Sequence, residues 1–498
     1  MIREENIRLI FGLKIKYLRQ EKSVSLSEVA KKTAISISYL NEIEKGKKYP
    51  KVEKVGALAN YFGVTYDWLI SLQLPNKLAP IGELLRSNIL QELPLEIFGL
   101  EPSGLLDLLS AAPAKVSAFI STLIQMTRSY DVRVGQFYFS ALRSYQEMYE
   151  NYFPELEAEA EQFKKEFCKE ENVQDDFLRD LLEQKYHYTI EEEELTQKKY
   201  LNSLRSLLAF HEEKPTLHIN KHLSKKQRAF IYAREVGFNY MELRERPYTS
   251  TWVEVNSFEE VLNNFKASYF ASALMIPEME FVSDCKHFFQ QKTLDQGFFI
   301  QLLDKYHATP EMLMQRLTNV LPRHFGLKKL YFLRINNRID SADFNITKEL
   351  HLSGKHNPHA SALSEHYCRR WLSIRLIDAL KQQQLAGSFK RPMFKAQVST
   401  YYKSETKYLV MSLARPVYPI SGENSSISIG VLLDSQTKKK IKFLKDENLD
   451  AQYVGVICES CPAKDCQERI APEVRLKQSA YQQEMRLAIL KMQQKSEK

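Results

Sequence analysis

Apolar residues in the first seventy positions recur every three or four residues, the spacing of short helices that bury one face. The positions expected to face the core are Leu13, Tyr17, Leu18, Val29, Ala30, Tyr39, Leu40 and Ile43. Ser25 and Glu28 form a capping box that opens a second helix, and Ser36 is the expected N-cap of a third. Two further helices, around residues 52–62 and 65–72, complete a five-helix bundle that contains a helix-turn-helix.

The pattern then changes several times, which indicates a multidomain, mainly helical protein with a C-terminal α+β part. Helical spacing dominates after a proline-containing linker, and an aromatic-rich helix at 135–157 suits a core or a dimer contact. We expect a helix-turn-helix domain at 1–72, a linker at 73–80, a helical connector and candidate dimerisation region at 81–200, a strand-and-helix domain at 201–325, a sensor domain at 326–475, and a C-terminal helix or tail at 476–498.

Within the fourth of these regions, LHINKHL predicts a short strand, and Ser224 with Gln227 forms a capping box that opens the next helix. Another helix is expected over residues 257–281. Further on, a helix is expected over 361–383, and the strand-like runs are LKKLYFLRIN, MFKAQVSTYY, KYLVMSLARPVY, SSISIGVLLD and KIKFL. Together they predict an antiparallel sheet with a flanking helix, a layout that many small-molecule sensing domains share.

Composition describes a folded chain with large cores: 44% of the 498 residues are hydrophobic, including 26 Tyr and 27 Phe. The net charge of +8 is compatible with a polyanionic partner. No signal peptide or membrane-length apolar run is apparent, and six cysteines in so long a chain do not form a disulfide framework. We therefore expect a cytoplasmic protein with reduced thiols.

The N-terminal bundle resembles the helix-turn-helix of Cro-type (XRE) repressors, with Glu44, Gly46 and Pro50 as its most specific marks. Gly46 is also expected to end the third helix as its C′ residue. In such domains that helix enters the major groove of double-stranded DNA. Residues 1–70 contain 13 Lys and Arg against 8 Asp and Glu, which favours attraction to phosphates. The residues expected at the DNA are Ser25, Ser36, Ile37, Ser38, Asn41, Lys45, Lys47 and Lys48.

The region 201–325 resembles the ImmA/IrrE metallopeptidase-like domain, which carries H-E-x-x-H on a helix. Two histidines four residues apart hold zinc there, and the glutamate activates water. In this chain Arg234 and Phe238 stand at the histidine positions around Glu235, and Lys266 or Asn264 stands where a third ligand is expected. Because these residues cannot hold a divalent cation, we predict a degenerate domain without peptidase activity and no catalytic residue.

Three of the six cysteines, Cys458, Cys461 and Cys466, lie within nine residues in C-x2-C-x4-C spacing. In a protein with reduced thiols this spacing favours a soft metal over a disulfide. A fourth ligand must come from elsewhere, with Cys368 the leading candidate and His366 its substitute. Spacing alone leaves open an iron–sulfur cluster, a zinc ion, a thiol switch or inert cysteines.

The combined architecture is similar to the short-chain fatty acyl transcriptional regulators, with the strongest likeness at residues 1–72 and 455–473. The ending C-x2-C-x4-C-x2-R-x-x-P and the Trp371 that follows Cys368 carry this resemblance. It implies a regulator that senses a short-chain acyl-CoA, with an iron–sulfur cluster favoured over zinc at the cysteines.

We therefore expect a sequence-specific DNA-binding transcription regulator, acting as a homodimer that reads a palindromic site. Its effector residues are unknown, although an acyl-CoA needs cationic partners such as Arg334, Arg369, Arg370 and Arg415. The alternatives are a phage-type or toxin–antitoxin repressor without a metabolic ligand, and a metallopeptidase that cleaves a partner repressor.

Overall fold

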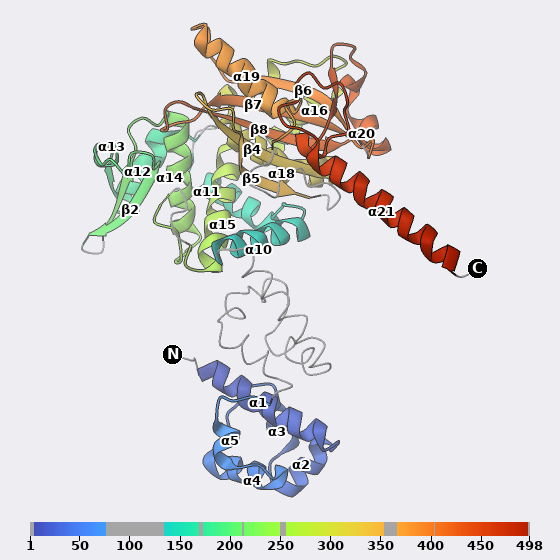
Figure 1. Cartoon of the computed structure of the whole chain (residues 1–498). Helices are drawn as coiled ribbons and strands as arrows, with labels where there is room; N and C mark the ends of the chain where they lie inside the picture. The colour runs from blue at the N-terminus through green and yellow to red at the C-terminus, as the bar shows by residue number, and fades with distance from the viewer. Residues whose placement is uncertain are drawn as a thin grey trace. The chain divides into compact units, whose positions relative to one another are not determined.

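A computed structural model of the chain describes residues 4–75, 134–168, 173–211, 214–249, 255–352, 366–402 and 404–496 (Figure 1). The chain divides into two compact units, one of residues 1–145 with 254–258 and the other of residues 146–253 with 259–498. Most of the predicted linker and the first part of the predicted helical connector lie outside the described residues. Among the residues described, no helix has the length and apolar character that crossing a membrane requires.

The first unit begins with the predicted five-helix bundle. Its helices are α1 (Glu4–Glu21), α2 (Leu26–Thr33), α3 (Ile37–Glu44), α4 (Val52–Phe62) and α5 (Tyr66–Ile70). The hydroxyl of Ser25 accepts a hydrogen bond from the Glu28 N–H at 3.2 Å, the first of the two bonds of the predicted capping box. Ser36 caps α3 by accepting from the Tyr39 N–H at 3.2 Å. Ala34, with a φ of 55°, makes the turn between the two helices.

Two cations of α1, the buried Lys14 and the half-buried Arg19, tie this helix to the rest of the bundle. Arg19 forms a bidentate pair with Glu44 at the end of α3, with Nε–Oε1 at 2.6 Å and Nη2–Oε2 at 2.8 Å. The Lys14 ammonium donates to the backbone carbonyls of Trp68 and Ser71, each at 2.6 Å, and so satisfies the C-terminal end of α5. These bonds hold α3 in a fixed orientation relative to the rest of the bundle.

The second unit contains a helical part and a three-stranded sheet. Its helices are α11 (Pro154–Phe167), α12 (Asp175–Gln184), α13 (Glu194–Gln197), α14 (Lys225–Tyr240), α15 (Phe258–Met275), α16 (Glu278–Gln290), α17 (Phe298–Lys305) and α18 (Pro310–Phe325), while α10 (Val134–Met148) spans the division between the units. The strands are β1 (Thr189–Glu191), β2 (Ser206–His211) and β3 (Lys214–Ile219), in the order β1-β3-β2. Ser224 and Gln227 form the predicted capping box at the start of α14.

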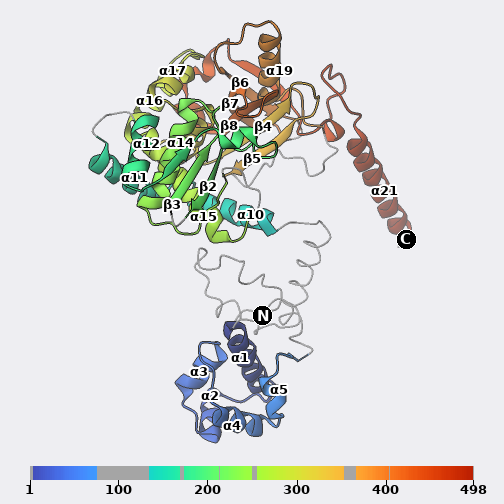
Figure 2. The ribbon, with the colours of Figure 1, turned by 90° about the vertical axis from the view of Figure 1, so that its left-hand side faces the viewer.

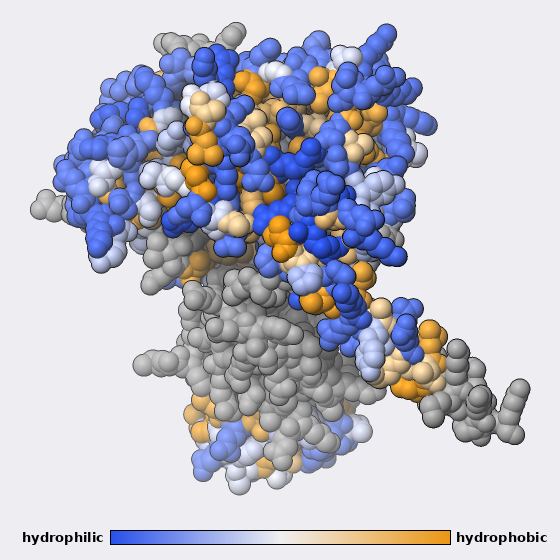
Figure 3. All heavy atoms as spheres, turned by 45° about the horizontal axis from the view of Figure 1, so that its top comes forward, coloured by the Kyte–Doolittle hydropathy of each residue, from blue (hydrophilic) through white to orange (hydrophobic). Residues whose placement is uncertain are grey.

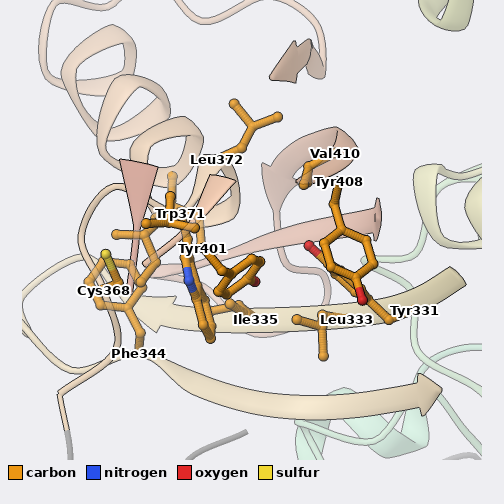
Figure 4. Packing of buried hydrophobic residues seen from close by; sticks show 13 residues of the cluster. Tyr331, Leu333, Ile335, Phe344, Cys368, Trp371, Leu372, Tyr401, Tyr408 and Val410 are labelled. Atoms are coloured by element: carbon orange, nitrogen blue, oxygen red, sulfur yellow. The ribbon is translucent and has the colours of Figure 1, made fainter. Parts of the chain in front are cut away.

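A six-stranded sheet forms the C-terminal part, in the order β5-β4-β8-β7-β6-β9. Its strands are β4 (Leu330–Arg338), β5 (Asn345–His351), β6 (Met393–Tyr401), β7 (Lys407–Pro416), β8 (Glu423–Leu432) and β9 (Asp450–Val454). Helix α19 (Leu372–Leu385) contacts β6, β7 and β8, and Trp371, Leu372 and Tyr401 share its core cluster (Figure 4). Helix α18 also contacts β4, β7 and β8. The sheet thus packs against α18, which precedes it in the sequence, and against α19, which lies between β5 and β6.

The structure corrects four sequence predictions. The sheet is mixed, because β9 pairs in parallel with β6. KIKFL forms the end of α20 (Ser435–Lys440) and a 3-10 turn, Lys442–Lys445, since two alternately buried residues, Ile441 and Phe443, suit either structure. Of the helix predicted at 361–383, residues 361–365 lie outside the described residues and 366–371 are not helical, so Cys368 precedes α19. The stretch 81–200 is not wholly helical, because β1 lies inside it and is too short to show a period.

The chain ends in α21 (Val474–Ser496), which follows a 3-10 turn at Cys458–Ser460. Figures 1 and 2 show this helix extending away from the sheet that precedes it. Hydrophobic side chains remain exposed along it, as the space-filling view in Figure 3 shows. They include Tyr481, Met485, Leu487 and Ile489.

Candidate functional site

The outward face of α3 carries three of the eight residues predicted to meet DNA, Ile37, Ser38 and Asn41, and the others lie before or after this helix. Leu40 and Ile43 are fully buried and fix which side of the helix faces the core. Ile37 is 49% exposed at the first position of α3. Ser25, Ser36, Ser38, Lys47 and Lys48 are also exposed, and Asn41 and Lys45 are half-buried. The N-terminal end of α3 therefore presents an apolar, a hydroxyl and an amide side chain on one accessible side.

The basic segment after α3 follows a sharp turn. Gly46 has a φ of +71°, which favours glycine, and a Cβ there would approach a Leu9 side-chain carbon to 2.4 Å. The Lys48 ammonium lies 4.0 Å from the Glu42 carboxylate, and both side chains are exposed to solvent. An ion pair that exposed is weak and leaves the lysine available to a phosphate.

In the second unit, the glutamate of the degenerate peptidase motif is buried and paired. Glu235 is 2% exposed, and its carboxylate accepts hydrogen bonds from Arg246 Nη1 at 3.1 Å and from the Tyr188 hydroxyl at 3.3 Å. Arg234 Nη2 lies 3.5 Å from its other oxygen. The Arg246 guanidinium also lies over the Phe238 ring, 5.3 Å from its centre. In a peptidase of this fold, zinc would lie beside this glutamate. Here the Arg246 guanidinium supplies the positive charge beside Glu235.

Arg246 is a residue that the motif analysis missed. It lies eleven positions beyond Glu235 in MELRERPYTS, where no spacing rule distinguishes it from a surface arginine. Its second bond, from Nη2 to the Tyr188 hydroxyl at 3.0 Å, depends on a contact between segments far apart in sequence. The Glu235 carboxylate thus has two guanidinium partners, Arg234 and Arg246.

Replacing Glu235 by glutamine is expected to leave the metal content unchanged and to lower the free energy of unfolding by roughly 1.5–3 kcal/mol, the range for hydrogen bonds to charged groups. The loss follows because Arg246 and Arg234 would share no carboxylate at this position. Metal analysis and denaturant unfolding measure the two quantities. The exposed Glu242→Gln is the matched control and should stay within about 0.5 kcal/mol. Metal-dependent cleavage of a partner protein that disappears in Glu235→Gln would contradict the structural role.

The cysteine-rich ending pairs with the segment that carries Cys368. Tyr367 and Ile457 form an antiparallel bridge. The Cys368 N–H donates to the Val456 carbonyl at 3.0 Å, and the Cys458 N–H donates to the His366 carbonyl at 2.8 Å. Backbone pairing therefore brings Cys368 next to the terminal cysteines, although about ninety positions separate them.

Two of the four candidate sulfur ligands lie against Gly455. The Gly455 N–H donates to Cys368 Sγ at 3.3 Å, and a Cβ on this glycine would lie 2.9 Å from Cys461 Sγ. Cys368, Cys458 and Cys461 are all buried, whereas Cys466 is half-buried. Burial raises the pKa of the Cys368 thiol to about 11. A metal would have to displace a proton from this thiol.

The donor types fit a soft metal, but their present positions do not form a finished site. In the ranges that the structure describes, no three His, Cys, Asp or Glu side chains are placed to hold a metal ion together. The sulfur atoms would have to move closer to one another around the ion. His366 Nδ1 lies 2.7 Å from the Glu459 carboxylate, which leaves Nε2 as the nitrogen that could bind a metal.

An arginine organises the loop of the terminal cysteines. Arg469 donates to the backbone carbonyls of Cys458 at 2.8 Å, Cys461 at 3.0 Å and Ala463 at 2.6 Å. Arg469 is the arginine of the C-x2-R-x-x-P ending. The motif therefore identified the residue, but the sequence did not show that it binds the backbone of the cysteine loop. Trp371 has a similar part, because its indole N–H donates to the Gly455 carbonyl at 2.8 Å. Both residues fix backbone around the sulfur atoms.

The remaining two cysteines lie apart from these four. Cys285 is buried in α16, and Cys168 follows α11. Burial raises the pKa of both thiols, that of Cys168 to about 11. Neither thiol is activated, as is usual for structural cysteines.

The four arginines proposed for an anionic effector separate into two places. Arg334 and Arg415 lie near one buried carboxylate, that of Glu311. Arg369 and Arg370 instead flank Cys368, where Arg369 lies over the Phe344 ring at 4.5 Å and Arg370 donates to the Tyr402 hydroxyl at 3.2 Å.

Comparisons with known proteins match two parts of the chain. Residues 15–69 match the family model described as "Helix-turn-helix", and residues 190–318 match that described as "IrrE N-terminal-like domain". The "HTH-type transcriptional regulator DdrOP3" of Deinococcus deserti is 35% identical over 57 residues, which cover 11% of this chain. The chain spans 44% of the length of that curated relative.

A solved structure, described as a "Mycobacterium tuberculosis transcriptional regulator", is 17% identical to this chain, with a TM-score of 0.45. The match covers 67% of this chain and 93% of that one. The two family models coincide with the bundle that presents α3 and with the region of Glu235. The chain therefore contains a helix-turn-helix domain and, downstream of it, an IrrE N-terminal-like domain.

Proposed function

We propose that this protein is a sequence-specific transcription regulator that binds double-stranded DNA through α3 and responds to a short-chain acyl-CoA. The observation that carries the proposal is the exposed N-terminal end of α3, held by the Ser36 cap and by the buried anchors Leu40 and Ile43. A short helix fixed on one side and open on the other can enter a major groove.

The chemistry of α3 assigns different roles to its outward-facing residues, of which Ile37 and Ser38 are exposed and Asn41 is half-buried. Asn41 can make two hydrogen bonds to an adenine edge, Ser38 can pair with several bases, and Ile37 can contact a thymine methyl group. Lys45, Lys47 and Lys48 follow the helix and suit phosphates, which position the protein without reading sequence.

Two substitutions separate these roles. Asn41→Ala is expected to reduce discrimination between operator and random DNA by about 1–3 kcal/mol, because a bidentate base contact is lost. Lys47→Ala should weaken binding to all duplexes alike and lower the salt slope by about 1, because one phosphate contact is lost. Binding titrations at several salt concentrations measure both effects.

Exposed Ser27→Ala on α2 serves as the control for these titrations. Equal losses of operator and random binding in Asn41→Ala and Lys47→Ala would remove Asn41 from base readout. The operator itself can first be selected from random duplexes with the full chain.

A single helix-turn-helix makes few base contacts, so the proposed regulator binds a palindromic site as a homodimer. The proposal includes no peptidase activity. It is supported by Arg234 and Phe238 at the positions of the zinc-binding histidines, and by the pairing of Glu235 with Arg246. The IrrE-like region would then act by packing or by sensing rather than by cleavage.

The four clustered cysteines are proposed to hold a metal centre, with an iron–sulfur cluster favoured and zinc as the alternative. Cys458, Cys461, Cys466 and Cys368 would supply the ligands. A cluster would provide a group that gains or loses an electron, whereas zinc would provide a structural link alone. The support is the backbone pairing of the two segments and the N–H bond that Cys368 Sγ accepts from Gly455. Arg469 would keep the loop in shape around the metal.

A further inference from the structure

Four cationic side chains of the second unit surround one carboxylate. They are Arg205, Arg334, Lys348 and Arg415, and with Glu311 they are called the basic cluster below. Arg334 Nη1 lies 3.3 Å from Glu311 Oε2, and Lys348 Nζ lies 3.4 Å from Glu311 Oε1. The side chains of Glu311 and Arg334 are each 17% exposed, so the cluster is accessible to solvent but largely covered by protein.

The sheet register places three of these cations on one face. Arg334 of β4 is paired with Lys348 of β5, and Arg415 of β7 is paired with Ser425 of β8. Paired residues in neighbouring strands project to the same face. Arg334 Nε also donates to the Ser425 hydroxyl at 3.4 Å. One row of side chains therefore crosses β5, β4, β8 and β7: Lys348, Arg334, Ser425 and Arg415. Three cations therefore lie on one face of the sheet, around the Glu311 carboxylate.

Helix α18 points its N-terminal end at this row. Thr309 caps the helix, and Glu311 is in its first turn. The N-terminus of a helix of 16 residues adds partial positive charge and favours an anion. Glu311 satisfies part of this preference but supplies one negative charge against four positive ones.

The charges within the basic cluster do not balance. Burial would raise the pKa of the Glu311 carboxyl, but Arg334, Lys348, Arg205 and Arg415 together hold it well below its usual range. Burial and the neighbouring Arg205 lower the pKa of Arg415 to about 10. Among the residues that the structure describes, Arg415 forms no ion pair with a carboxylate. Closely packed cations of this kind favour the arrival of a second anion.

The IrrE-like region contributes to the same place. Arg205 precedes β2, and its pKa is lowered by burial and then by the charges of Arg334 and Arg234, against the attraction of Glu311. Arg234, 7% exposed, has its Nε buried without a hydrogen-bond partner. Arg234 stands where a peptidase of this fold has a metal-binding histidine. A positively charged side chain therefore replaces one that would bind a metal ion. The preference of this region is therefore reversed, from a metal ion to an anion.

We propose that the basic cluster binds a phosphoryl group of a phosphorylated metabolite. The negative charge of this group would neutralise the excess positive charge of Arg205, Arg334, Lys348 and Arg415. Guanidinium groups pair with phosphate oxygens in bidentate fashion, and several of them can share one pyrophosphate. Acyl-CoA, the effector of the proposed function on which this inference rests, carries such phosphates. A ligand here would contact the IrrE-like region through Arg205 and the sheet through Arg334 and Arg415 together.

Calorimetric titration of the full chain with pyrophosphate and, separately, with acetyl- and propionyl-CoA tests the site. Arg415→Met and Lys348→Met should each weaken binding of every bound ligand by about tenfold or more, because charge-assisted hydrogen bonds are lost. Arg338→Met is the matched control, since Arg338 lies on β4 but is exposed and pairs with Asp340. The affinity of Arg338→Met for each ligand should stay within about twofold of that of the parent chain. Circular dichroism checks that each variant is folded, and the half-exposed Lys348 remains informative if Arg415→Met does not fold.

The outcomes separate the site from the identity of its ligand. Binding of pyrophosphate that depends on Arg415 and Lys348, without any binding of the two acyl-CoAs, would support the phosphoryl site and remove the proposed effector. Acyl-CoA binding that both substitutions leave unchanged would overturn the site while the effector stands. Folded protein that binds none of the three ligands at millimolar concentration would overturn the site as well.

Discussion

Replacing Arg316 by methionine is expected to lower the free energy of unfolding of the second unit by about 3–5 kcal/mol, the range for breaking a buried ion pair. Arg316 in α18 has no exposed side-chain surface, and its Nη2 donates to Glu157 Oε2 of α11 at 2.7 Å. Its Nε donates to the Ile276 carbonyl at 3.0 Å. The substitution leaves the Glu157 carboxylate, 10% exposed, without its cation. The Tyr269 hydroxyl, which donates to Glu157 at 2.6 Å, cannot replace that charge.

Denaturant unfolding of the full chain measures this loss. The exposed Arg323 of the same helix is the matched control, and Arg323→Met should stay within about 0.5 kcal/mol. Removing both charges in Arg316→Met with Glu157→Leu should recover part of the stability, because no charge remains buried alone. A loss under about 1 kcal/mol in Arg316→Met would contradict the pair's importance.

Replacing Cys458 or Cys461 by serine is expected to abolish metal binding altogether. If an iron–sulfur cluster is present, protein isolated without oxygen should be brown and should bleach on reduction, and either variant should be colourless. Cys368→Ser should have the same effect, and it tests the fourth ligand directly. Because the ligands come from two segments, loss of the metal should also make the terminal helix α21 easier to cleave by protease.

Cys285→Ser and Cys168→Ser are the controls and should leave colour, metal content and proteolysis unchanged. Colourless parent protein with one tightly bound zinc would keep the ligand assignment and remove the redox role. Parent protein without metal that still binds its operator would remove both. Metal analysis and an absorption spectrum on the same sample decide among these results.

Local features of the fold were predictable from the sequence, because the interactions that create them span few residues. The Ser36 cap of α3 and the capping box of Ser224 with Gln227 are each formed within three positions. The alternation in SSISIGVLLD predicted β8, which is buried between β4 and β7. Residues 450–454, which pair with β6, alternate over only a few positions, too few to predict a strand, so β9 and its parallel pairing were missed.

The candidate sites were predictable in part. The grouping of Cys458 with Cys461 is a matter of spacing, whereas Cys368 was proposed because three thiolates require a fourth ligand, and its approach depends on the pairing of two distant segments. The basic cluster could not be found, because Arg205 and Arg415 meet only through the packing of sheet and helix. Of the arginines suggested for an effector, sequence could not separate Arg334, which pairs with Glu311, from Arg369, which lies beside Cys368.

The parallel pairing of β9 with β6 has a consequence for the newly made chain. During synthesis β6, β7 and β8 leave the ribosome before β9 exists, so the outer edge of β6 must wait with its backbone groups unpaired. A strand edge with unpaired N–H and C=O groups can form hydrogen bonds with another chain, which leads to aggregation. A ribosome that stalls before Asp450 would release a sheet lacking both this edge strand and the partner of Tyr367. Interrupted translation is therefore a route by which this protein would aggregate, even though its full-length fold covers the edge.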